Sequence, residues 1–343
     1  MKSQLRPSTE ADHAAIASFL CEIFGVSRAF PSVQLNQIHW KYSAPRRDYE
    51  GERSWVMERD GQIIAHGGVW PVCLLTGDGE TAGLHVIDWA ARPGAAGTGA
   101  FVIKQLSRLG GFTCAAEGSE DTEKILPLLG FRVAQELTLW ARPASPLRQA
   151  LTHHQFDARL PARCARNTCW RYWPPLGPSW RVEEVVPEEV PEDLWPRPEP
   201  HLAVFRRSAA LFRYLAGCPS ARVRLYRATG AQAAGYFCLS RVPGVAKIID
   251  AWTPSPAVED WAALYASAFR EALADPEVFE VVTLAGIARA TQALHRAGFR
   301  PRGVTDLTLA ENAGLIQPGR EFHFQMADTD KGFRHSGRPE YLT

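Results

Sequence analysis

The second half of this 343-residue chain repeats the first half in the same order, and this repeat limits the possible folds more than any single motif does. The matched segments are Trp40-Lys41-Tyr42 with Phe212-Arg213-Tyr214, Asp60-Gly61-Gln62 with Thr229-Gly230-Ala231-Gln232, Val86-Ile87-Asp88 with Ile248-Ile249-Asp250, and Leu129-Gly130-Phe131-Arg132 with Ala297-Gly298-Phe299-Arg300. We therefore expect two similar domains in tandem, residues 1–142 and 201–343, joined by a proline-rich connecting segment, residues 143–200. Each domain should fold around its own mixed sheet.

The stretch from Leu84 to Leu109 reads as a buried strand, a glycine-rich turn and a helix. Three glycines, Gly94, Gly97 and Gly99, lead into the helix. The free backbone N–H groups and the positive dipole end of such a helix point into the turn. No Asp or Glu occurs from residue 89 to 116, while Arg92, Lys104 and Arg108 are basic. The stretch is typical of an anion site and favours a pyrophosphate.

Other phosphate loops share this outline. A Walker A loop needs Lys and then Ser or Thr after its second glycine, but Ala100 and Phe101 follow Gly99. A dinucleotide fingerprint starting at Gly97 requires Gly or Ala at position 102, which is Val. A strand-turn-helix that needs the glycines only for flexibility stays open as an alternative.

The turn resembles the acyl-CoA loop of the GNAT (GCN5-related N-acetyltransferase) superfamily, whose pattern is Arg or Gln, two residues, Gly, one residue, then Gly or Ala. Gly97-Thr98-Gly99 carries the second half of that pattern, and Leu128-Leu129-Gly130-Phe131 resembles the closing turn of the family. The order of helices and strands over residues 3 to 142 is also similar. Two positions depart from the family, because Gly94 stands where it has Arg or Gln, and Leu126 where many members have a proton-donating Tyr.

The resemblance implies an α/β fold of two tandem GNAT-like domains, each a mixed, mostly antiparallel twisted sheet flanked by helices. The arrangement is similar to bacterial tandem GNAT proteins, some encoded with polysaccharide synthesis genes. It also implies acetyl-CoA, or another acyl-CoA, as co-substrate and no metal. The residues expected to bind it are Trp89, Ala90, Ala91, Ala95, Ala96, Gly97, Thr98, Gly99 and Ala100.

Acyl transfer to an amine requires a route for protons and donors for the oxyanion. Asp88 is the leading candidate for the base by its position before the loop, and Glu117, at the end of the next strand, is weaker. Asp250 occupies the place of Asp88 in the second half, so both aspartates are equally open to a structural role. His85 is a further weak candidate, and His66 is expected to pack in a hairpin.

The second half should lack the anion site. Pro254 and Pro256 each remove an N–H from the corresponding turn, and Glu259 and Asp260 place carboxylates at the helix start. We therefore expect one acyl-CoA per chain.

Composition excludes several classes of function. The 38 basic and 37 acidic residues nearly cancel, which argues against a nucleic-acid partner. The start of the chain lacks a signal peptide and no run approaches a membrane span, so we expect a cytoplasmic protein without membrane insertion. Seven scattered cysteines favour reduced thiols. Cys164 and Cys169, with His153 and His154, are poorly spaced for a metal site.

The leading hypothesis is a CoA-dependent N-acyltransferase, an enzyme that acts on an amine of a small metabolite, an amino sugar or a cell-surface precursor, as a monomer or homodimer. A non-catalytic GNAT-fold ligand-binding protein is the alternative, and an aminoacyl-tRNA-dependent transferase is the third. We expect the acceptor in a cleft between the halves, near Asp88 and Glu117. The stretch Phe322 to Asp330 should line it as a closing strand, with Asp328 and Asp330 available to hold a cationic amine and Asp330 the more exposed to solvent.

Overall fold

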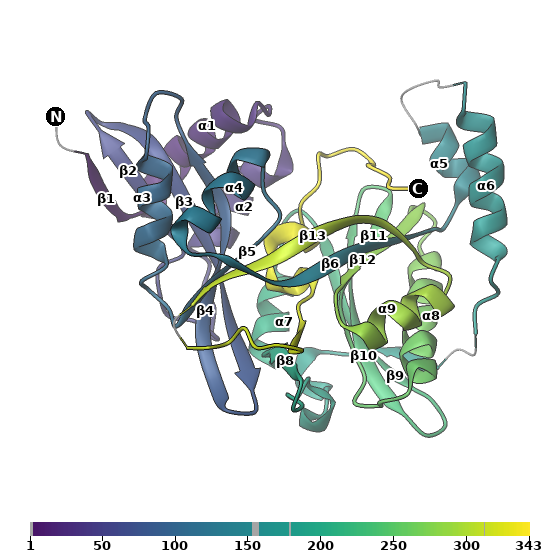
Figure 1. Cartoon of the computed structure of the whole chain (residues 1–343). Helices are drawn as coiled ribbons and strands as arrows, with labels where there is room; N and C mark the ends of the chain where they lie inside the picture. The colour runs from purple at the N-terminus through teal and green to yellow at the C-terminus, as the bar shows by residue number, and fades with distance from the viewer. Residues whose placement is uncertain (1–2, 153–157, 178–179, 312) are drawn as a thin grey trace.

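A computed structural model describes residues 3–152, 158–177, 180–311 and 313–343, and Figure 1 shows its two lobes on either side of a central group of strands. The first half contains β1 (Gln4–Pro7), α1 (His13–Phe24), α2 (Leu35–Tyr42), β2 (Ser54–Arg59), β3 (Gln62–Thr76), β4 (Gly79–Ala91), α3 (Thr98–Leu106), β5 (Phe112–Ala116), α4 (Glu120–Ile125) and β6 (Arg132–Pro143). The connecting segment contains α5 (Pro146–Thr152), α6 (Leu160–Tyr172) and β7 (Arg181–Glu184). The second half contains β8 (Leu202–Phe205), α7 (Ala209–Ala216), β9 (Arg222–Thr229), β10 (Ala234–Val242), β11 (Val245–Trp252), α8 (Val258–Leu273), β12 (Glu280–Ala285), α9 (Ala288–Arg296), β13 (Arg300–Glu311) and β14 (Glu321–His323).

The expected α/β fold and the repeat are both present. Each half places a helix, an antiparallel hairpin, a further strand, a helix, a parallel strand, a helix and a long closing strand in the same order. The parallel neighbours are β4 with β5 in the first half and β11 with β12 in the second. The repeat seen in the sequence is therefore a repeat of tertiary structure.

The two halves do not have separate sheets, so that expectation is wrong. One sheet runs through the molecule in the order β1-β2-β3-β4-β5-β13-β6-β12-β11-β10-β9-β7. The halves exchange their closing strands, because β13 pairs with β5 of the first half and β6 pairs with β12 of the second. The exchanged strands also pair with each other. The first half therefore depends on β13 to continue its sheet beyond β5, and the boundaries at residues 142 and 200 stay a prediction.

Local chemistry explains the hairpin and the helix that flank the glycine loop. Asp60 and Gly61 both have positive φ, 53° and 75°, which is the geometry of the tight turn expected between β2 and β3. β3 is a single long strand that runs from Gln62 to Thr76. A Cβ on Gly67 of β3 would lie 2.8 Å from Val102 of α3, so this glycine lets the helix pack closely on the sheet.

Repeat-related helices meet at the junction of the two halves. Trp40 on α2 and Tyr214 on α7 stack with ring centroids 5.1 Å apart. The Trp40 indole N–H donates to the Tyr214 carbonyl at 3.1 Å, and the Tyr214 hydroxyl donates to the Trp40 carbonyl at 2.7 Å. One buried hydrophobic cluster contains side chains of both halves. No helix in the described ranges is both long and apolar enough to cross a membrane.

Candidate active site

A cavity of about 730 Å³ opens where β4 and β5 diverge. The two strands pair only from Gly83–Phe112 to His85–Cys114, and beyond this point neither forms a ladder with the other. The cavity walls include Asp88 and Trp89 of β4 and Leu126, which follows α4. The opposite wall belongs to the second half and the C-terminal stretch, with Val245, Lys247, Val282, Met326, Thr329, Asp330, Lys331 and Arg334. Its volume falls within the range of small-molecule sites, and it lies between the halves.

The glycine loop lies where β4 leaves this cavity. Gly97 is the N-cap of α3 with φ 77°, a conformation that favours glycine. The amides of Gly99 and Ala100 have no helical acceptor because the residues four positions earlier lie outside α3. The first turn of α3 contains no acidic residue. Ala96, Gly97 and Thr98 also border a second, more open hollow beside β1. The loop can therefore present N–H donors to an anion.

Close packing fixes the loop against β4. The Trp89 indole N–H donates to the Gly99 carbonyl at 3.0 Å. A Cβ on Gly99 would lie 3.2 Å from that indole nitrogen and 3.3 Å from the Ala91 side chain. Trp89, Ala90 and Ala91 thus lead directly from the cavity to the loop. A ligand bound at the loop amides and extended back along β4 would reach the cavity.

Asp88 is held by two side chains from α2. It lies at a bulge in the pairing of β3 with β4 and has a φ of 46°. Its carboxylate forms an ion pair with Lys41 and accepts a hydrogen bond from the Tyr42 hydroxyl at 2.6 Å. Burial opposes its ionisation, but the charge and hydrogen bond of Lys41, with the bond from Tyr42, lower the pKa of Asp88. Asp88 borders the cavity as an ion-paired group, and its role as the base stays a prediction.

The other first-half candidates also have partners. Glu117 lines the cavity with a φ of 71° and forms an ion pair with Lys331. His85 Nε2 accepts a hydrogen bond from the Ala116 amide at 3.1 Å, and burial lowers the pKa of His85 to about 3. His66 Nδ1 lies 2.9 Å from the Asp88 carbonyl, and burial lowers its pKa to about 4. Both imidazoles are neutral at physiological pH.

One expectation about the loop region needs correction. Arg92 was expected to favour the pyrophosphate, but its guanidinium pairs with Glu22 of α1 and donates to the Ile63 carbonyl at 2.9 Å. Lys104, on α3, and Arg108, just after its end, remain exposed. Leu126 is buried in the cavity wall, so no tyrosine hydroxyl is present at that position.

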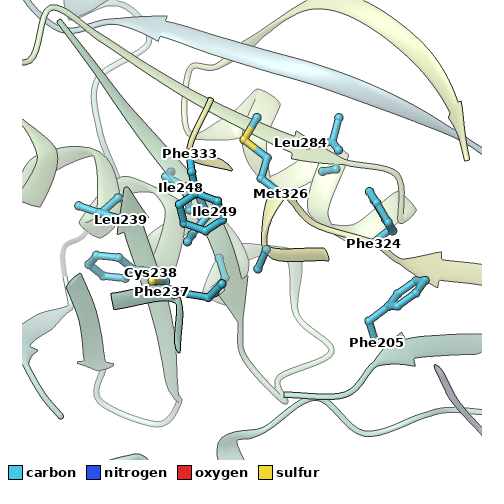
Figure 2. Packing of buried hydrophobic residues seen from close by; sticks show 14 of the residues in the cluster. Phe205, Phe237, Cys238, Leu239, Ile248, Ile249, Leu284, Phe324, Met326 and Phe333 are labelled. Atoms are coloured by element: carbon cyan, nitrogen blue, oxygen red, sulfur yellow. The ribbon is translucent and has the colours of Figure 1, made fainter. Parts of the chain in front are cut away.

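The C-terminal stretch lines the cavity differently from the closing strand expected there. Only Glu321–His323 form a strand, β14, which pairs with β8. Asp328 is buried and accepts hydrogen bonds from Arg207 at 2.6 and 2.8 Å, so it is not available to an acceptor. Asp330, expected to be the more solvated of the two, lines the cavity and is half-buried. The side chains of Phe324, Met326 and Phe333 belong to one buried cluster with Ile248, Ile249 and Leu284 of β11 and β12 (Figure 2).

In the second half, the position that corresponds to the first-half site is filled by the chain's own side chains. Asp250 pairs with Arg207 at 2.9 Å and accepts a hydrogen bond from Tyr236 at 2.7 Å. At the start of α8 the Glu259 and Asp260 carboxylates occupy the first turn, as expected. The Ser255 hydroxyl accepts from the Ala257 amide at 3.2 Å. His323 packs against Trp252 of β11 with ring centroids 5.0 Å apart, so the chain itself covers this end of β11.

The sequence analysis did not identify the cations that pair with Asp88 and Asp250. Lys41 and Arg213 were matched as parts of a repeated triplet, but Lys41 pairs with Asp88 while Arg213 points to Glu188 at the surface. The basic residues of the C-terminal stretch, including Lys331 and Arg334, were also missed. Among the described residues no group of three His, Cys, Asp or Glu could hold a metal ion, and His153 and His154 lie outside those residues.

Comparison with solved structures identifies the fold. The chain resembles a GCN5-related N-acetyltransferase from Anabaena variabilis with a TM-score of 0.55 and 12% identity, over 90% of this chain and 72% of that one. A putative acetyltransferase from Pyrococcus horikoshii matches with a TM-score of 0.54 and 10% identity, over 94% of each chain. Saccharomyces cerevisiae N-myristoyltransferase matches with a TM-score of 0.61 and 9% identity, over 99% of this chain and 87% of that one.

At these identities the likeness establishes the GNAT fold and does not by itself establish an activity. The matches span nearly the whole chain, which agrees with GNAT-like units in both halves. No protein-family model and no curated protein sequence matches the chain.

Proposed function

We propose that this protein is an acyl-CoA-dependent N-acyltransferase that transfers an acyl group, most simply acetyl, to an amine of a small molecule. The observation that carries the proposal is the cavity where β4 and β5 diverge, next to a helix start with free amides and no acidic residue. Transfer needs a thioester and an amine in one water-excluding space, and a site for the CoA pyrophosphate outside it. The yeast N-myristoyltransferase of similar fold was solved with myristoyl-CoA bound.

In this proposal the pyrophosphate binds within residues 95–100, at the amides of Ala96, Gly97, Gly99 and Ala100, because the amides of Ala95 and Thr98 already donate to the Arg92 and Ala95 carbonyls. Trp89, Ala90 and Ala91 guide the pantetheine along β4, so that the thioester lies in the cavity. The amine enters from the side of the second half, near Asp88 and Glu117. The domain boundaries at residues 142 and 200 and a cytoplasmic location, where acyl-CoA is made and used, belong to the same proposal.

A non-catalytic acyl-CoA-binding protein is the second candidate. Leu126 provides no acid for the departing thiolate, and Asp88 and Glu117 are both ion-paired. These observations favour binding without turnover.

Release of free thiol from acetyl-CoA in the presence of a panel of amines separates the two candidates, with the acylated amine identified by mass spectrometry. We expect amine-dependent thiol release by the intact chain. Tight acetyl-CoA binding without thiol release for any amine would instead favour the binding protein. Absence of both would remove both candidates.

A further inference from the structure

One carboxyl group of the cavity is both shielded from solvent and without an ion-pair partner. The four acidic residues that line the cavity are Asp88, Glu117, Asp330 and Glu340. Asp88 and Glu117 each form an ion pair with a lysine. Glu340 is exposed to solvent. Within the described ranges, the Asp330 carboxylate forms no ion pair within 4.0 Å and no hydrogen bond. The hydrogen bonds that this residue accepts go to its backbone carbonyl. Asp330 is therefore the half-buried carboxyl that is free to contact a ligand.

The chain holds Asp330 in a fixed turn. The amides of Phe333 and Arg334 donate to the Asp330 carbonyl at 3.0 and 3.2 Å. A Cβ on Gly332 would lie 2.8 Å from the Ile249 side chain, so the turn packs tightly against β11. The Trp70 indole N–H donates to the Ala327 carbonyl at 3.0 Å, which ties the same segment to β3. Asp330 thus stands on a support that contacts both halves.

The surroundings of Asp330 give it the properties of a proton acceptor. Burial and the negative charge of Asp88 raise the pKa of Asp330, and nearby cations oppose this rise. The charged and titratable groups that face it are Asp88 on β4, Lys41 and Tyr42 on α2, Lys247 on β11 and Arg334 in the C-terminal stretch. A carboxyl with a raised pKa accepts a proton more strongly than an ordinary aspartate does. Asp88 acts here through its negative charge, which raises the pKa of Asp330, so we call it a positioning residue.

We propose that Asp330, supplied by the second half, is the general base that deprotonates the acceptor amine in the acyl transfer of the first half. The inference rests on the proposed function. The acceptor ammonium gives one proton to the Asp330 carboxylate, and the freed nitrogen lone pair attacks the thioester carbonyl carbon. The C–N bond forms, and the C–S bond breaks with its electron pair left on the CoA sulfur. The nitrogen loses a second proton, the thiolate takes up one, and Asp330 returns the other to solvent.

This assignment gives the C-terminal stretch a double role. Its residues 322–328 fill the end of β11 in the second half, where His323 packs on Trp252 and Asp328 pairs with Arg207. Two residues further on, the same stretch places Asp330 in the open cavity of the first half. The second half has no anion-binding loop with free amides of its own, but its C-terminal stretch completes the site of the first half.

The test is the Asp330→Asn variant of the intact chain, measured for kcat/KM of amine-dependent thiol release across pH. We expect kcat/KM at neutral pH to fall about 10²- to 10⁴-fold, which is the usual contribution of a general base. The acidic limb set by Asp330 should disappear, leaving only the rise set by deprotonation of the acceptor amine, so the deficit should shrink at high pH where the free amine dominates. Acetyl-CoA affinity, measured by calorimetry, should stay the same. Asp330→Glu should recover part of the rate.

Asp328→Asn is the matched control, because it removes a neighbouring carboxylate that lies outside the cavity. It should lower thermal stability but keep the acidic limb. If the wild type turns over an amine and Asp330→Asn keeps both the rate and the acidic limb, Asp330 is not the base although the proposed function stands. If a folded wild type turns over no amine, both proposals are overturned. Circular dichroism of each variant confirms that it is folded.

Discussion

The two halves of the molecule share one fold, but the opening beside the central strand is a cavity in the first half and is covered by the chain in the second. In the first half, the space beyond the paired part of β4 and β5 is a cavity, and the helix start beside it has free amides. In the second half, the chain covers the end of β11 with its own residues, and α8 begins with two carboxylates. The difference teaches that the fold alone does not make the site. The site needs both an open cavity and, beside it, a helix start whose amides are free.

The aspartates at the repeated position show the same contrast. Asp250 has no exposed surface and lies with Arg207 and Asp328 in a fully buried ion cluster. Asp88 also pairs with a cation and a tyrosine, but it borders the cavity. One aspartate is enclosed by protein, whereas the other faces the space where we expect a ligand.

The largest expected effect tests this contrast through stability. Arg207→Met leaves two buried carboxylates without their cation, and breaking a buried pair typically costs about 3–5 kcal/mol. Lys41→Met should cost less, because water in the cavity can solvate Asp88. Urea denaturation of both variants measures the difference in the free energy of unfolding. Arg213→Met is the matched control, since its pair with Glu188 is exposed and should contribute little. Equal losses for Arg207→Met and Lys41→Met would contradict the contrast.

The next effect concerns the loop. Gly97→Asp gives α3 a carboxylate like those at the start of α8, and it puts a side chain on a residue with φ 77°. We expect acetyl-CoA affinity to fall at least about 100-fold, or about 2.7 kcal/mol. Calorimetry measures the loss. Ala257→Asp at the N-cap of α8 is the control and should leave affinity unchanged; an effect there equal to that at Gly97 would show that the halves had been misassigned.

The sequence predicts the repeat well because hairpins, glycine turns and capped helices are local signals. The Asp60-Gly61 turn and the Ser119 cap of α4 are both formed by residues close together in the sequence. The strand exchange has no local signal, because β6 can pair with β5 or with β12 without changing its own pattern of residues. The partner of Asp88 was missed for a similar reason, since Lys41 is 47 residues away in sequence. Asp330 is the more exposed of the two C-terminal aspartates, as expected, but the partner of Asp328 was missed because Arg207 is far away in sequence.

A smaller effect follows from the buried histidines of the first half. His66 and His85 are neutral when folded because burial lowers their pKa values from 6.5 to about 4 and about 3. Below pH 6.5 the unfolded chain binds protons that the folded chain does not, so stability falls as the pH falls towards 4. Each histidine contributes about 1.4 kcal/mol per pH unit in this window.

Urea denaturation of the wild type and His85→Gln at several pH values measures that contribution. Glutamine keeps an acceptor for the Ala116 amide but cannot be protonated. We expect the variant to lose less stability on acidification, by about 1.4 kcal/mol per pH unit. An identical slope in the two proteins would show that His85 is not held neutral beside the cavity.

The most direct test of the difference between the halves is the stoichiometry of acetyl-CoA binding to the intact chain by isothermal titration calorimetry. We predict one molecule per chain, bound at the loop before α3. Two molecules per chain would show that the start of α8 also accepts the pyrophosphate. No binding at any concentration would contradict an acyl-CoA site in this protein.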